Sequence, residues 1–241
     1  MTKKLSLLFF ICILSALNIN AEVEGSCGTN VRYSLDTSTG LLSITGTGAM
    51  KNYGSYSSVP WYSNKSYIKV VEISDGVTSI GYNAFYGCSG LTSITIGNSV
   101  TEIEYSAFSG CSGLTKVTIN SNAIVSKSYN SHSSLKSIFG SQVKEYYIGE
   151  GVTTIGQWAF HECYSLTSIT IPNSVKSIEK GAFYNCTGLT SVTIPYGVTS
   201  IVGSAFYGCS GLTSVTIPAS VTSLEGAFTS CPSLTKVILN N

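Results

Sequence analysis

The feature that most constrains this chain is a phrase that recurs at a fixed distance. "AFYGCSGLTSVTIP" occupies residues 205–218, and close copies occupy residues 84–96 and 182–195. Each copy follows a short segment that begins with valine, and these valines lie 23 residues apart except for one longer gap: Val77, Val100, Val152, Val175, Val198 and Val221. A fixed period of this length indicates a solenoid, in which each repeat forms one coil stacked on the next.

The apolar pattern within one unit explains why such coils must stack. The segment "TSVTI" alternates with period two, as a half-buried strand does, whereas "SAFYGCSGL" has the character of a compact turn. A lone coil leaves its Phe and Leu side chains uncovered, and each contributes ~1.5–3 kcal/mol when it is buried. We therefore expect parallel strands about 4.8 Å apart in successive coils, with Phe183 lying directly beside Phe206.

One unit departs from the pattern. The irregular unit, residues 123–151, contains "SNAIVSKSYNSHSSLKSIFGSQ", which lacks both the Ala-Phe pair and the cysteine. Its tail at 143–151 still aligns with 91–99, and residues 68–76 align upstream, so the array begins before the first complete unit. The interruption leaves open whether one continuous face runs along the whole array.

Six cysteines occupy one register position in the units. One interpretation is a ladder of disulfides or metal ligands, because same-register Cα atoms about 4.8 Å apart fall within disulfide range. The other is a small apolar residue that packs in a tight corner. With Cys27 the chain beyond residue 21 has seven cysteines, an odd number that favours packing thiols; the six are Cys88, Cys111, Cys163, Cys186, Cys209 and Cys231.

The chain divides into three segments. Residues 1–21 combine Lys3 and Lys4 with an apolar run of secretory length, which predicts a signal peptide cleaved after Ala21; a retained membrane anchor is the alternative. Residues 22–66 contain two strand patterns around "DTSTG", which predict a β-hairpin that caps the array. Residues 67–241 form the predicted solenoid, with no later segment long and apolar enough to span a membrane.

Composition argues against several classes of function. The chain is 10% charged with a net charge of +1 and has no basic block, so nucleic acid is not an expected partner. Its two aspartates, Asp36 and Asp75, occupy turn positions, and its two histidines, His132 and His161, have no cysteine pair nearby. No phosphate-binding, dinucleotide-binding, calcium-loop or nucleophile motif occurs. We predict no enzyme activity, no cofactor and no metal.

These units resemble a known family, the BspA-like leucine-rich-repeat proteins, whose repeat reads roughly LxxIxIPxxVTxIgxxAFxxCxx. The resemblance covers residues 68–241, and "CGTNVRYSLDTSTGLLSITGTGAM" (27–50) followed by "PWY" (60–62) looks like the module that often precedes such arrays. It implies a β-rich solenoid: a leucine-rich-repeat right-handed array of parallel short strands behind an N-terminal β-hairpin cap. It also implies a secreted or surface-exposed protein that adheres to host matrix proteins or other cells.

Two sets of residues are candidates for a binding surface. Tyr and Trp at variable positions of the units are favoured anchors at interfaces, and the same rings could stack on sugars or pack between coils: Tyr82, Tyr86, Tyr105, Trp158, Tyr184, Tyr196 and Tyr207. The outward positions of the strands form the second set, although Ser and Thr there could simply solvate the sheet: Ser93, Thr95, Lys116, Thr118, Tyr147, Thr170, Thr193 and Thr216.

The sequence therefore predicts a non-catalytic secreted or cell-surface interaction protein. Its expected partner is a protein or glycan on host or neighbouring cells, and the C-terminal coil, which ends on a strand, predicts end-to-end self-association. The alternatives are a structural repeat protein without a specific ligand and a carbohydrate-acting enzyme. Ice binding through ranked Thr rows is a further alternative, against which the irregular unit and the interrupting charges argue.

Overall fold

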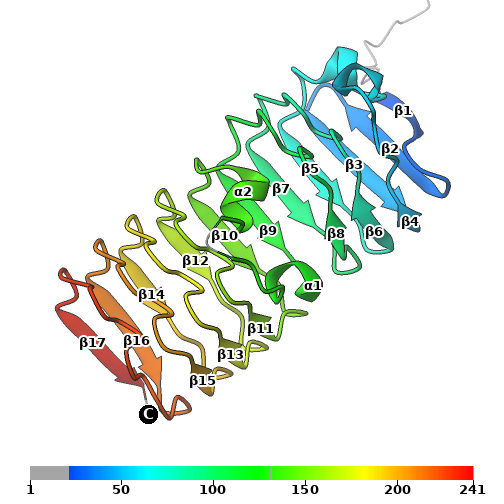
Figure 1. The fold of residues 1–241 in the computed structure, drawn as a ribbon. Coiled ribbons are helices and arrows are strands. Elements are labelled where there is room, and N and C mark those ends of the chain that lie inside the picture. Colours follow the sequence, from blue (N-terminus) through cyan, green and yellow to red (C-terminus); the bar gives the residue numbers. More distant parts are fainter. Residues whose placement is uncertain (1–21, 131, 241) are drawn as a thin grey trace, which may run out of the picture.

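The computed structural model describes residues 22–130 and 132–240, and it shows a β-solenoid of about seven turns. Successive coils follow one another along a rod, with β1 at one end and β17 at the other (Figure 1). The predicted fold class, a β-rich solenoid of parallel short strands, is confirmed. The predicted signal peptide lies outside the described residues.

Most strands line one side of the rod, called the strand face here. Its first part is an eight-stranded sheet of β1 (Glu22–Ser26), β2 (Val31–Asp36), β3 (Leu41–Gly46), β5 (Val70–Ile73), β7 (Ser93–Ile96), β9 (Lys116–Ile119), β10 (Glu145–Ile148) and β12 (Ser168–Thr170). Its second part contains β14 (Ser191–Thr193), β16 (Ser214–Pro218) and β17 (Lys236–Asn240). β3 pairs in parallel with β5, and the later strands of both sheets pair only in parallel, as stacked coils require.

A second side of the rod carries shorter strands, which come from the Val-x-x-Ile segments except for β4 (Gly48–Ala49). They form two three-stranded sheets, β4, β6 (Val77–Ile80) and β8 (Glu102–Ile103), then β11 (Thr154–Ile155), β13 (Ser177–Ile178) and β15 (Ser200–Ile201). The Ala-Phe-x-x-Cys segments form the third side, called the turn face. Short helices complete the elements: the 3₁₀ helices η1 (Tyr56–Ser58) and η2 (Tyr62–Asn64), α1 (Asn122–Val125) and α2 (Leu135–Phe139).

The strand register confirms the alignment of the units. Ile94 of β7 pairs with Val117 of β9, its equivalent 23 residues later. In the irregular unit, Tyr146 of β10 takes the same position and pairs with both Val117 and Ile169. The irregular unit therefore returns to the common register at β10, and its extra residues lie between β9 and β10, where they form α1 and α2 (Figure 1).

The N-terminal end is closed by antiparallel strands. β2 and β3 form the predicted hairpin, and the backbone N–H of Ser38 donates to the Asp36 carboxylate (2.8 Å) in the turn between them. A third strand that the sequence analysis did not predict, β1, pairs antiparallel with β2. Below the hairpin, Trp61 is fully buried, stacks on Phe85 with ring centroids 5.6 Å apart, and donates its indole N–H to the Ala84 carbonyl (3.0 Å).

A column of aromatic rings runs along the core. Phe183 and Phe206 stack with centroids 4.9 Å apart and planes 9° apart, which confirms the prediction that they lie side by side. In the irregular unit, Phe139 of α2 and Tyr146 of β10 continue the column between Phe108 and Phe160. The lost Ala-Phe pair therefore does not interrupt the core, because two other rings fill the same space.

The same-register cysteines pack beneath this column. Five of the six are buried, Cys231 is half-buried, and all are free thiols. Sγ of Cys186 donates to the carbonyl of Phe160 in the preceding coil (3.1 Å), and Cys111, Cys209 and Cys231 make the equivalent bond. Burial raises the pKa of Cys88, Cys111 and Cys163 to about 12, which keeps these thiols neutral.

The strand face is parted at one place. In the coils before it, the backbone N–H of the residue ahead of each strand donates to its equivalent in the coil before, as Thr167 does to Lys144 (2.9 Å). The described residues include no such bond from Thr190 to Thr167, and β12 and β14 belong to separate sheets. The turn face stays joined at this level, because the Phe160 N–H donates to the Ala182 carbonyl (2.7 Å).

Replacing Tyr146 by phenylalanine should stabilise the protein. The side chain is 1% exposed, and among the described residues its hydroxyl has no hydrogen-bond partner. A buried hydroxyl without a partner costs about 1–3 kcal/mol, so Tyr146→Phe should raise the free energy of unfolding by roughly 1 kcal/mol in urea denaturation. The matched variant Tyr129→Phe removes a hydroxyl that donates to the Ile124 carbonyl (2.8 Å), so it should lower the free energy of unfolding. Equal effects of the two variants would contradict this account.

Candidate functional site

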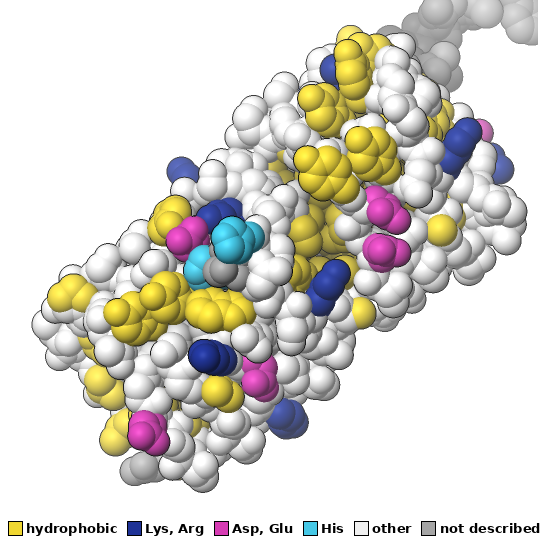
Figure 2. All heavy atoms as spheres, viewed as in Figure 1, with side chains coloured by type: hydrophobic (Ala, Val, Ile, Leu, Met, Phe, Trp, Pro, Cys, Tyr) yellow, Lys and Arg dark blue, Asp and Glu magenta, His cyan; other side chains and the backbone are white. Residues whose placement is uncertain are grey.

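Exposed aromatic side chains gather along the turn face. Figure 2 shows two groups of hydrophobic side chains on a largely uncharged surface, one over the N-terminal coils and one over the C-terminal coils. Because the chain has few charged residues, neither positive nor negative charge dominates this face. It is therefore suited to contacts through aromatic rings and hydroxyl groups.

The first group, called the N-terminal tyrosine group, comprises Tyr56, Tyr62, Tyr82, Tyr86 and Tyr105. Tyr56 stacks on Tyr86 (centroids 5.2 Å apart), and Tyr82 stacks on Tyr105 (6.2 Å). The Lys65 ammonium lies over the Tyr62 ring, 4.6 Å from its centroid. Tyr105 is 79% exposed, so Tyr82 covers one of its faces and leaves the other accessible.

The second group, called the aromatic ladder, comprises His161, Tyr184 and Tyr207 with Trp158 beside them. His161 and Tyr184 have centroids 5.5 Å apart, and Tyr184 stacks on Tyr207 at 4.7 Å with planes 12° apart. Trp158 meets both His161 (5.1 Å) and Tyr184 (5.3 Å) edge-on. The rungs of the ladder are 23 residues apart, so the register of the coils alone places them in one line.

Trp158 lies at an unusual backbone position. Its φ is +58°, in the left-handed region that other coils fill with Asn83, Ser106, Gly181 or Ser204. A bulky residue there costs of order 1–3 kcal/mol of backbone strain. A Cβ added to Gly181 would lie 2.5 Å from the Trp158 ring, so the glycine of the next coil makes room for the indole. The edge-on contacts of the indole with His161 and Tyr184 are favourable and act against this strain.

The structure corrects part of the predicted exposed set. Tyr82, Tyr86, Tyr105 and Tyr196 are exposed as predicted. Trp158, Tyr184 and Tyr207 are half-buried, because each ring packs against its neighbours in the ladder. Three further residues of these groups were not predicted: Tyr56, Tyr62 and His161. Only His161 has a sequence signal, its 23-residue spacing from Tyr184.

The predicted strand-face residues lie in register on the outer side of the strands. Thr95, Thr118, Tyr147 and Thr170 pair in one row, and Thr193 pairs with Thr216 beyond the parting of the strand face. In the neighbouring row, Ser93 pairs with Lys116. The Lys116 ammonium lies 4.5 Å from the centroid of the Tyr147 ring, so charge and aromatic groups interrupt the hydroxyl row in the irregular unit.

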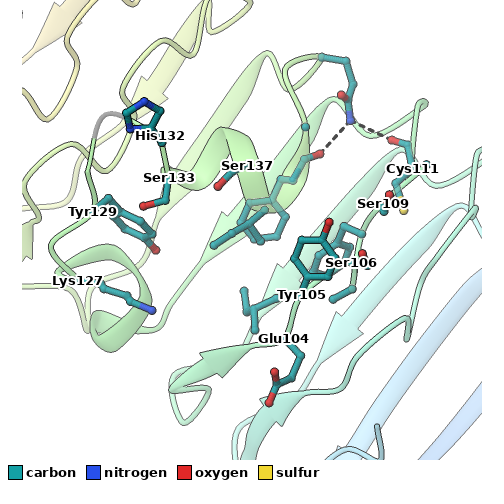
Figure 3. A pocket seen from close by; sticks show the side chains of 18 of the residues that line it. Glu104, Tyr105, Ser106, Ser109, Cys111, Lys127, Tyr129, His132, Ser133 and Ser137 are labelled. Atoms are coloured by element: carbon teal, nitrogen blue, oxygen red, sulfur yellow. Dashed lines mark hydrogen bonds between the residues drawn. The ribbon is translucent and has the colours of Figure 1, made fainter. Parts of the chain in front are cut away.

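A cleft of about 740 Å³ opens where the irregular unit meets the coil before it. Tyr105, Ser106 and Ser109 line one side of the cleft, and Tyr129, Ser133 and Ser137 line the other (Figure 3). At one end, the Gln142 amide donates to the carbonyls of Phe139 (2.9 Å) and Cys111 (3.0 Å) and ties the two coils together.

The ionisable groups of this face do not converge on one point. Lys136 and Glu162 form an ion pair (2.9 Å), and this bond lowers the pKa of the Glu162 carboxyl. Burial lowers the pKa of His161 below its ordinary value, which favours the neutral imidazole. Within residues 22–130 and 132–240, no group of three or more His, Cys, Asp or Glu side chains is placed to hold a metal ion. The same residues include no helix long and apolar enough to cross a membrane.

Stacked parallel coils with a 23-residue period define a solenoid of the leucine-rich-repeat class. The family described as "BspA type Leucine rich repeat region" matches the chain in six copies, over residues 60–151 and 139–241. The chain belongs to this BspA-type leucine-rich-repeat family, which confirms the resemblance seen in the repeat.

Similar solved structures include bacterial leucine-rich repeat proteins. A leucine-rich repeat protein from Eubacterium ventriosum is 23% identical (TM-score 0.42; 92% of this chain and 79% of that one covered). A leucine rich cell surface protein from Faecalibacterium prausnitzii is 18% identical (TM-score 0.42; 91% and 95% covered). The T. pallidum Leucine Rich Repeat protein is 25% identical (TM-score 0.43; 88% and 81% covered). No curated protein matches the chain.

Proposed function

We propose that this protein is a non-catalytic interaction module that acts outside the cell or at its surface. The observation that carries the proposal is the aromatic ladder, together with the N-terminal tyrosine group on the same face. Family membership supports an interaction role, since solenoids present long faces to partners. The apolar run in residues 5–17 supports secretion.

The proposed partner is a protein on host or neighbouring cells. Tyr and Trp are enriched among the residues that dominate binding energy at protein interfaces, because a rigid ring offers a large contact area at low entropic cost. The ladder holds its rings in place through stacking, so little conformational freedom is lost when a partner docks. We propose that residues 22–66 cap the array and that residues 67–241 carry the binding face. Self-association through β17, where Val237 and Leu239 are exposed, stays a prediction.

A binding screen with a matched variant tests the proposal. Purified protein would be assayed against immobilised fibronectin, fibrinogen, laminin and collagen, and against whole cells. The combined variant Tyr86→Ser, Tyr184→Ser and Tyr207→Ser should weaken binding by at least about tenfold, because it removes stacked rings from both groups. The variant Tyr67→Ser removes a tyrosine that is 53% exposed outside both groups and should bind as the parent does.

Two outcomes would contradict the proposal. Unchanged binding by the combined variant, with an unchanged circular dichroism spectrum, would exclude the aromatic face. Binding to none of the proteins or cells would favour the alternative of a structural repeat protein without a specific ligand. A melting curve of the combined variant separates lost contacts from lost fold, because Tyr184 and Tyr207 are half-buried.

A further inference from the structure

The cleft beside α2 has a structural cause that sets it apart from the aromatic ladder. On the turn face, neighbouring coils are joined by backbone bonds such as the one from the Phe85 N–H to the Ala107 carbonyl (2.8 Å). The equivalent segment of the irregular unit bonds onward, from the Leu135 N–H to the Ala159 carbonyl (2.8 Å). Among the described residues no such bond joins Phe108 to α2, so the cleft opens between these two coils.

The accessible lining of the cleft is aromatic and hydroxylic. Phe108 and Phe139 lie beneath it but are 3% and 0% exposed, so they offer a ligand almost no apolar surface. Tyr105 stands at one rim with a free ring face, and Tyr129 stands across from it (Figure 3). The Tyr129 ring is held in place by the hydrogen bond from its hydroxyl to the Ile124 carbonyl (2.8 Å).

Hydroxyl groups between the two rings are available to a ligand. Ser106 and Ser109 line the Tyr105 side, and their side chains make no hydrogen bond to any residue that the structure describes. On the opposite side, the Ser137 hydroxyl in α2 is already engaged, because it donates to the Ser134 carbonyl (2.7 Å) and accepts from the Ser134 N–H (3.1 Å). The Ser106 and Ser109 hydroxyls can each donate and accept a hydrogen bond, which matches a ligand that is itself rich in hydroxyl groups.

The charges of the lining balance. Glu104 and Lys127 contribute one negative and one positive charge, and Figure 3 shows the Glu104 carboxylate pointing away from Tyr105. The Lys127 ammonium lies 6.0 Å from the centroid of the Tyr129 ring. A lining without net charge favours a neutral ligand, and an aromatic ring beside hydroxyl groups matches the two kinds of surface that a sugar presents.

We propose that this cleft binds a short neutral oligosaccharide. A pyranose ring presents one face of C–H groups, which packs on an aromatic ring, and an edge of hydroxyl groups, which pair with serine hydroxyls and backbone groups. Tyr105 is the stacking platform, and Ser106 and Ser109 bind the hydroxyl edge. The volume lies within the range of about 300–1,000 Å³ that small-ligand sites occupy. The site shares no residue with the aromatic ladder and does not rest on the proposed protein partner.

Titration with defined sugars tests this site. Maltotriose, cellotriose and N,N′,N″-triacetylchitotriose would be added to the full chain, with 3′-sialyllactose as a charged comparison, in saturation-transfer NMR and isothermal titration. We expect at least one neutral trisaccharide to bind, and Tyr105→Ala to weaken its affinity by at least about tenfold. Tyr67→Ala, which removes an exposed tyrosine outside the cleft, should bind as the parent does.

A second variant shows whether Tyr105→Ala weakens binding by removing the ring or by disturbing the fold. Ser109 is exposed at the cleft, so Ser109→Trp should fill the cleft and abolish binding without touching the core. Failure of all three neutral sugars to bind, binding of 3′-sialyllactose alone, or binding that survives either variant would overturn the proposal. The combined variant of the aromatic groups replaces no residue that lines the cleft and should retain sugar binding, so the two proposals fail separately.

Discussion

Replacement of Phe183 by alanine is expected to lower the free energy of unfolding by about 3–5 kcal/mol. Phe183 is fully buried and stacks on both sides, 5.0 Å from the Phe160 ring and 4.9 Å from the Phe206 ring. Truncation therefore leaves a cavity between two coils that neither neighbour can close. Urea denaturation followed by circular dichroism would measure the loss.

Phe228 provides the matched control for this effect. It occupies the same column position in the last complete coil, is half-buried, and stacks on Phe206 at 5.0 Å. No ring follows it among the described residues, so Phe228→Ala should cost roughly half as much or less. Equal losses in the two variants would show that stacking between coils does not set the stability of the array.

Substitution of Gly46 by alanine is expected to destabilise the N-terminal cap by at least about 2 kcal/mol. Gly46 ends β3 with φ +110°, and a Cβ built there would lie 2.0 Å from the backbone oxygen of Asn30. Two independent effects therefore oppose any side chain, a left-handed backbone and a clash with the chain that enters β2. Amide exchange of β1 to β3 would show the loss locally.

Gly54→Ala is the control for this prediction. A Cβ at Gly54 meets nothing within 4 Å, and its φ lies outside the left-handed region. The substitution should be neutral, or should stabilise the protein by up to about 1 kcal/mol through the unfolded chain. If Gly46→Ala proved as harmless as Gly54→Ala, the hairpin would not depend on this turn.

The repeat predicted the coils because its physical basis is periodic. When a Phe recurs every 23 residues, the repeat spacing alone identifies the Phe that stacks on it in the next coil, as Phe183 and Phe206 show. Phe139 and Tyr146 complete the same column at other spacings, so no period could have identified them. β1 was missed because its segment, "EVEGS", has no strong apolar alternation.

The candidate sites were harder to predict for the same reason. The cleft depends on where the irregular unit turns, and the orientation of Tyr129 depends on a bond to Ile124 that no periodic pattern encodes. The aromatic ladder is periodic, yet its tyrosines are half-buried because their rings pack against rings of neighbouring coils. A prediction of exposure from the residue type alone does not include this packing. Trp158 at positive φ is a departure from local preference that only coordinates reveal.

The parting between β12 and β14 has a mechanical consequence. A solenoid whose coils are hydrogen-bonded on two sides and unbonded on the third bends most easily at the unbonded level. The bonded sides then act as the hinge. His161 and Tyr184 belong to the two coils on either side of this parting. Beneath them the Phe160 and Phe183 rings remain stacked, with centroids 5.0 Å apart. Bending of the rod there would change the distance between the His161 and Tyr184 rings. The aromatic ladder would therefore adopt one ring spacing on a curved target surface and another on a flat one.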